Sequence, residues 1–109
     1  MKIRFDYLHR DAGNYKNFGS VVLRDSKHRS LEEIENAIVA SLIDGQYFYA
    51  QSVGFPVLYG QYFDPMADAT WHEFESIAFE HDDTSKVNAD LEAVLGKLDE
   101  APISMENIQ

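Results

Sequence analysis

The chain has 109 residues, of which 45% are hydrophobic and 26% charged, and it contains no cysteine. This length and composition predict one folded domain, and the absence of cysteine excludes disulfides, thiolate nucleophiles and cysteine-based zinc sites. The formal net charge is −10, so we expect direct binding neither to nucleic acid nor to an anionic membrane.

Two predicted strands open the chain. In residues 2–9, three apolar side chains share one face at a spacing of two: Ile3, Phe5 and Tyr7. Residues 18–24 are rich in β-branched and aliphatic side chains, which favour strands. Because residues 11–14 have the composition of a turn, with Gly13 and Asn14 suited to a positive φ, we predict an antiparallel hairpin.

The clearest helix signal begins at Ser30. Ser30 and Glu33 have the spacing of a capping box, in which the side chains and the backbone of the first turn satisfy each other's hydrogen bonds. Four apolar residues then recur at helical spacing: Leu31, Ile34, Ile38 and Leu42. Asp44 and Gly45 are predicted to end this helix, with Gly45 as its left-handed cap.

The middle of the chain is strongly aromatic. Residues 46–53 predict a third strand, residues 57–63 a short edge strand or an ordered loop, and residues 64–68 a turn. Residues 70–80 predict a further strand, whose alternation places Trp71, Glu73, Glu75 and Ile77 on one face and His72, Phe74, Ser76 and Ala78 on the other. Adjacent strand residues point to opposite faces, so the histidine is not expected to share a metal ion or a proton with the glutamate that follows it.

A second helix is predicted to close the chain. Its apolar residues recur at helical spacing: Val87, Leu91, Val94, Leu95 and Leu98. Pro102 is predicted to end it, and residues 102–109 to form a flexible tail. We therefore expect a single α+β domain over residues 1–101, with an antiparallel sheet of four to five strands and two helices packed on one face, in the order ββα-ββ(β)-α.

The sequence contains no recognised catalytic, nucleotide-binding or metal-binding motif. It has no Gly-x-Ser-x-Gly elbow, no phosphate-binding loop and no dinucleotide fingerprint. His72 and His81 lie near several carboxylates in the sequence, but their spacing matches no recognised set of metal ligands. We therefore predict no catalytic residue, no cofactor and no metal site.

Charge is distributed unevenly along the chain. Residues 1–30 contain seven basic and three acidic side chains, whereas residues 31–109 contain sixteen acidic side chains and only two lysines. Nine of the fourteen aromatic residues lie between Tyr47 and Phe74, within this acidic part. Tyrosine and tryptophan are enriched where proteins bind one another, and carboxylates attract a basic partner. The predicted partner-binding residues are Tyr47, Tyr49, Tyr59, Tyr62, Asp64, Asp68, Trp71, Glu73, Glu75, Asp82 and Asp83.

These features favour a small acidic protein-binding module that inhibits or neutralises a macromolecular partner with a basic surface, of the immunity, antitoxin or anti-defence type. If the partner's basic groove normally holds nucleic acid, the carboxylates would mimic phosphates. Two alternatives stay open. One is a small enzyme or ligand-binding domain that uses His72 or His81 with nearby carboxylates. The other is a homodimer or larger homo-oligomer that buries its aromatic strand edge against its own copy.

Three segments carry a resemblance to a known family: residues 6–19, including Arg10-Asp11-Ala12-Gly13-Asn14-Tyr15-Lys16-Asn17-Phe18-Gly19, then Leu31-Glu32-Glu33-Ile34, and Trp71-His72-Glu73-Phe74-Glu75. They are similar to those of a family of small bacterial hypothetical proteins with no assigned function. The resemblance implies a bacterial or phage origin and assigns no activity. The N-terminal residues lack the apolar run of a signal peptide, and no stretch has the about 20 apolar residues of a membrane span. The cytoplasm is therefore the expected location.

Overall fold

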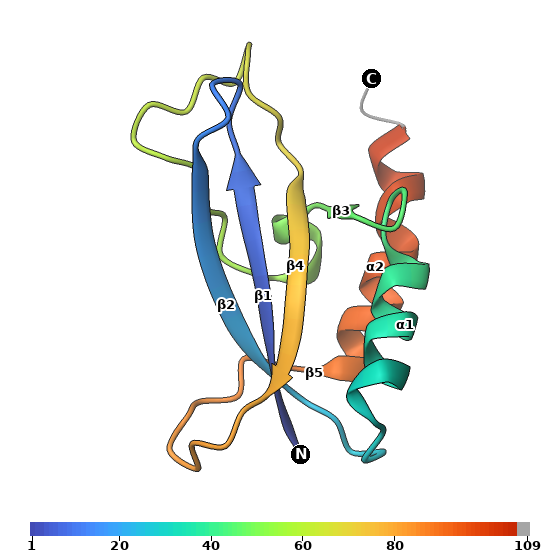
Figure 1. The fold of residues 1–109 in the computed structure, drawn as a ribbon. Helices are drawn as coiled ribbons and strands as arrows, with labels where there is room; N and C mark the ends of the chain where they lie inside the picture. The colour runs from blue at the N-terminus through green and yellow to red at the C-terminus, as the bar shows by residue number, and fades with distance from the viewer. Residues whose placement is uncertain (107–109) are drawn as a thin grey trace.

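The computed structural model describes the backbone of residues 1–106 and the side chains of residues 1–100. Its elements in chain order are β1 (Lys2–Arg10), β2 (Lys16–Arg24), α1 (Leu31–Ser41), β3 (Tyr47–Phe48), the 3₁₀ helix η1 (Ala50–Val53), β4 (His72–Phe79), β5 (Ala89–Asp90) and α2 (Leu91–Glu106). The five strands form one sheet in the order β3-β4-β1-β2-β5. Figure 1 shows α1 and α2 lying next to each other beside the curled sheet. The predicted α+β class is confirmed.

The sheet is mixed, so the prediction of an antiparallel sheet is wrong. Strands β1, β2, β3 and β4 pair antiparallel, but β5 pairs parallel with β2. Asn88 holds this segment beside β2, because its backbone N–H donates to the Val22 carbonyl and its side-chain oxygen accepts from the Val22 N–H. A strand of two residues that leads directly into a helix is too short to leave a periodic signal in the sequence.

Strand β1 lies at the centre of the sheet and pairs along its whole length with β2. Its predicted apolar face is buried: Ile3, Phe5 and Tyr7 are all at most 1% exposed. In the turn that follows, Asn14 takes a positive φ of 66°, whereas Gly13 does not. The Asp11 N–H donates to the Tyr15 carbonyl, and the Tyr15 N–H donates to Asp11 Oδ1. The predicted hairpin is therefore confirmed.

Strand β4 contains a β-bulge that the sequence pattern does not reveal. Asp6 lies opposite Ser76 and Tyr7 lies opposite Phe74, so Glu75 is an additional residue in β4. Because a bulge reverses the alternation beyond it, Ile77 packs against the same core as Phe74. The predicted assignment of these two residues to opposite faces of the strand is wrong.

The predicted third strand is mostly a different structure. Only residues 47 and 48 of the segment 46–53 form a strand, and η1 follows after a single residue. Gly54 ends η1 with a φ of 76°, a left-handed conformation that glycine adopts without strain. Residues 57–63 form a loop. Contacts between η1 and α2 explain this departure, since Ala50 and Val53 are buried in a helical turn.

Both helices differ from their predicted ends. The capping box is confirmed, with the Glu33 N–H donating to Ser30 Oγ and the Ser30 N–H donating to Glu33 Oε1. Helix α1 ends at Ser41, before the predicted stop. Helix α2 continues past Pro102 to Glu106, so the prediction that Pro102 ends it is wrong. Residues 107–109 of the predicted tail lie outside the described residues. No helix in the described residues is long and apolar enough to cross a membrane.

Candidate partner-binding surface

Two segments far apart in sequence meet at one end of the sheet. Strand β1 ends where its antiparallel neighbour β4 begins, so the β1–β2 turn lies beside the loop of residues 56–71. Figure 1 shows both at the same end, opposite the loop that follows β4. We call this end, formed by residues 10–17, the 56–71 loop, Tyr47 and Glu73, the turn end.

Two buried histidines attach the 56–71 loop to the sheet. The Leu58 N–H donates to His72 Nε2 at 2.9 Å, and His9 Nε2 lies 2.7 Å from the Ala69 carbonyl oxygen. Both histidines are at most 1% exposed. Burial, followed by the charge of neighbouring His9, lowers the pKa of His72 to about 4. Since His72 exposes no surface, it cannot touch a substrate, and its position suits a structural role.

The hydrogen-bond partners fix the tautomers of these rings. A backbone N–H can only donate, so His72 carries its proton on Nδ1; a carbonyl can only accept, so neutral His9 carries its proton on Nε2. Both Nδ1 atoms are buried and make no hydrogen bond with the described residues. The His9 Nδ1 atom is therefore an acceptor without a donor among the described residues.

Tyr59 belongs to the same anchoring layer. Its hydroxyl donates to the Thr70 carbonyl at 3.0 Å, and its ring stacks on Phe63 with the centroids 3.9 Å apart. The centroids of the His9 and Tyr59 rings lie 4.9 Å apart in a T-shaped arrangement. Burial raises the pKa of Tyr59. Tyr59, a predicted partner-binding residue, thus holds the loop's internal structure.

Asp68 joins the loop to the β1–β2 turn. Its Oδ1 accepts from the Ala12 N–H and its Oδ2 accepts from the Asp64 N–H, both at 2.8 Å. These two hydrogen bonds lower the pKa of the Asp68 carboxyl group. Both carboxylate oxygens are therefore already engaged within the protein.

Replacing Asp68 by alanine is expected to loosen this junction. The backbone N–H groups of Ala12 and Asp64 would lose their acceptor, so both should exchange with solvent about ten times faster in a hydrogen-exchange experiment. Glu75→Ala, at an exposed position on β4, is the control. Unchanged protection of the two amides in Asp68→Ala would show that the junction does not depend on this carboxylate.

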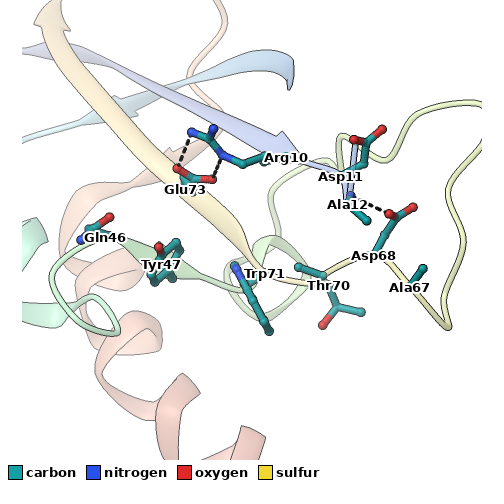
Figure 2. Close-up of a pocket in the computed structure, with 11 residues that line it drawn as sticks. Arg10, Asp11, Ala12, Gln46, Tyr47, Ala67, Asp68, Thr70, Trp71 and Glu73 are labelled. Carbon is teal, nitrogen blue, oxygen red and sulfur yellow. Dashed lines mark hydrogen bonds and ion pairs between the residues drawn. The ribbon is translucent and has the colours of Figure 1, made fainter. Parts of the chain in front are cut away.

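An open pocket of about 650 Å³ occupies one side of the turn end. Figure 2 shows Trp71 and Tyr47 along one part of its lining and the carboxylates of Asp11 and Asp68 along another. The ring centroids of Tyr47 and Trp71 lie 6.2 Å apart, and Trp71 is 44% exposed. We call this the Trp71 pocket.

The arginine of the Trp71 pocket is already paired. Arg10 donates from Nε and Nη2 to the two carboxylate oxygens of Glu73, at 2.8 and 3.2 Å, as Figure 2 shows. This bidentate arrangement is the strong form of an arginine–carboxylate contact. The unpaired charges that line the pocket are therefore the carboxylates of Asp11 and Asp68.

A second and more enclosed pocket, of about 410 Å³, shares Asp11 with the Trp71 pocket. We call it the Tyr62 pocket; its lining residues are His9, Asp11, Tyr15, Asn17, Gly60, Gln61, Tyr62 and Phe63. Tyr62 is 87% and Tyr15 78% exposed. Because Asp11 lines both pockets, the two pockets adjoin, and each of them also has aromatic residues in its lining.

The structure brings together part of the predicted set of partner-binding residues. Those at the turn end are Tyr47, Tyr59, Tyr62, Asp64, Asp68, Trp71 and Glu73. Asp64 Oδ1 accepts from the Met66 N–H within the loop. Sequence reasoning assigned Asp11 to the turn and gave Tyr15 no role, and only the fold places both in one pocket with Tyr62.

Other predicted residues lie elsewhere. Asp82 and Asp83 follow β4, at the opposite end of a strand about 25 Å long, where the Lys2 ammonium donates to the carbonyls of Asp83 and Ser85. Exposed His81 lines a pocket there with Glu80 and Asp83. Glu75 lines a hollow with Phe18, and Tyr49 precedes η1.

Other carboxylates lie on the two helices: Glu32, Glu33 and Glu35 on α1, and Glu92, Asp99 and Glu100 on α2. The acidic side chains therefore do not gather on a single side.

Comparison of the chain with protein-family models, with curated proteins and with solved structures finds no match.

Proposed function

We propose that this chain is a small protein-binding module that holds a basic segment of a macromolecular partner against the turn end and so blocks that partner's own binding surface. The observation that carries this proposal is that exposed Trp71 and exposed Tyr62 line two neighbouring pockets that share Asp11. Aromatic anchors beside unpaired carboxylates are suited to a lysine- or arginine-rich surface.

The electrostatics of the whole chain support the same partner class. The formal net charge of −10 attracts a basic protein over long range and accelerates the encounter, while the contacts at the turn end decide how long the complex lasts. Arg10 adds little repulsion, because Glu73 neutralises it. A basic groove that normally binds nucleic acid is the partner surface that we favour, with the carboxylates taking the places of phosphates, as in immunity, antitoxin or anti-defence proteins.

The turn end is suited to a lasting contact because several hydrogen bonds hold its loop in place. The loop that carries Tyr62 and Trp71 is held by the two buried histidines, by the hydroxyl of Tyr7 donating to the Pro56 carbonyl at 2.6 Å, and by Asp68. A surface that is ordered before binding loses less conformational entropy on association.

An affinity pull-down at two salt concentrations tests this proposal. The immobilised protein should retain a basic partner at about 50 mM salt and release most of it at about 500 mM, because screening weakens contacts between exposed charges. Trp71→Ala should retain at least about ten times less of it, whereas Val39→Ala, an exposed position on α1, should behave like the unaltered chain. Capture of neutral or acidic proteins alone, unaffected by salt, would contradict the proposal.

A further inference from the structure

We propose that the Tyr62 pocket is a socket for the guanidinium group of an arginine side chain. This inference rests on the proposed function, since it names the chemical group of the basic partner that enters the surface. It also stands on features of the pocket itself: aromatic rings, hydrogen-bond acceptors and the absence of a competing cation.

Aromatic rings supply most of the lining. Tyr15 and Tyr62 are largely exposed beside the pocket opening, and Phe63 and His9 contribute rings that are held further inside. The face of an aromatic ring attracts a cation, and the planar guanidinium group can also stack on it, which an ammonium group cannot do. A pocket with two exposed tyrosines therefore favours arginine over lysine.

Acceptors in the pocket match the donors of arginine. Asp11 Oδ1 accepts from the Tyr15 N–H, and Oδ2 makes no hydrogen bond among the described side chains. The side-chain amides of Asn17 and Gln61 also line the pocket and carry further acceptor oxygens, whereas His9 Nδ1 is buried and contributes no accessible acceptor. A guanidinium group carries five N–H donors and no acceptor. The eight lining residues include no lysine or arginine, so the charge of Asp11 is not already neutralised there.

The inner part of the pocket is fixed before a ligand enters. His9 is held by the Ala69 carbonyl, and Phe63 by its stack on Tyr59. Gly60 brings the loop close to β2, because a Cβ atom at this position would lie 2.9 Å from Asn17 Nδ2. Ordered inner rings and exposed outer tyrosines allow the socket to close on a side chain without rebuilding the loop.

A titration followed by NMR tests the socket with small probes. N-acetyl-arginine-methylamide is added to the ¹⁵N-labelled full chain, and the matching citrulline derivative, which has the same shape without the charge, is the control. We expect saturable shifts confined to Tyr15 and residues 60–63, with a dissociation constant in the millimolar range and at least about ten-fold weaker binding of citrulline. Equal shifts with both probes, no shifts, or shifts centred on Trp71 would overturn the inference.

Variants separate the socket from the proposed function. Tyr62→Ala and Asp11→Asn should each weaken arginine binding about five-fold or more; Tyr62 is exposed, and asparagine retains the oxygen that accepts from Tyr15. Trp71→Ala should leave arginine binding unchanged, because Trp71 does not line this pocket. If arginine binds but no basic partner is captured, only the proposed function fails. If a basic partner is captured through Trp71 and arginine does not bind, only the socket fails.

Discussion

Lowering the pH from 7 to 4.5 is expected to cost the folded protein about 2 kcal/mol of stability through His72 alone. Burial and the neighbouring His9 lower the pKa of His72 from 6.5 to about 4. Between these two values the unfolded chain binds a proton that the folded chain does not, so stability falls as the pH falls. Protonation of Nε2 would also remove the acceptor of the Leu58 N–H.

Urea unfolding at a series of pH values between 4.5 and 7.5 measures this effect. His72→Gln should flatten the pH dependence, because the amide oxygen can accept from Leu58 without titrating. His81→Gln, at an exposed position, should keep the slope of the unaltered chain. The same slope in His72→Gln as in the unaltered chain would contradict the assignment.

Replacing Asp25 by alanine is expected to cost about 2–3 kcal/mol of unfolding free energy. The Asp25 carboxylate is fully buried and accepts hydrogen bonds from the backbone N–H groups of Lys27 and Arg29 and from Arg29 Nη2. Burial opposes ionisation of this group, but the hydrogen bonds from Arg29 and Lys27 outweigh it and lower its pKa. Removal of the carboxylate would leave the two backbone donors without an acceptor and would leave Arg29 with Glu92 as its remaining ion-pair partner among the described residues.

Asp82→Ala is the matched control, because Asp82 also accepts two hydrogen bonds, both from Thr84, but is exposed. Its denaturation midpoint should be nearly unchanged, since water can replace the lost contacts. Equal losses of stability in the two variants, measured by urea unfolding at pH 7, would show that burial does not decide the role of Asp25.

Local signals in the sequence predicted the parts of the fold that depend on neighbouring residues. The capping box at Ser30 and the alternation of Ile3, Phe5 and Tyr7 are confirmed because each rests on contacts or periods within a few residues. The bulge at Glu75 and the parallel strand β5 depend on partners far away in the chain. No local periodicity records such contacts, and both were missed.

The candidate site was predicted in composition but not in arrangement. The sequence shows that Tyr62 and Trp71 lie in an acidic, aromatic region, and both are exposed at the turn end. It does not show that Asp68 is engaged by Ala12 and Asp64, or that Asp11 lines two pockets. Apart from the contact between Asp64 and Asp68, these contacts join residues more than fifty positions apart. They depend on the pairing of β1 with β4, which brings the two segments together.

Photo-crosslinking inside cells that express the protein tests the role of the turn end most directly. A benzoylphenylalanine residue is placed at position 62 or 71, and at position 35 or 83 as the control. Irradiation should join positions 62 and 71 to the same protein, one with a basic surface, and should leave positions 35 and 83 without that adduct. Adducts formed only from positions 35 or 83, or an acidic protein captured from position 71, would contradict the account.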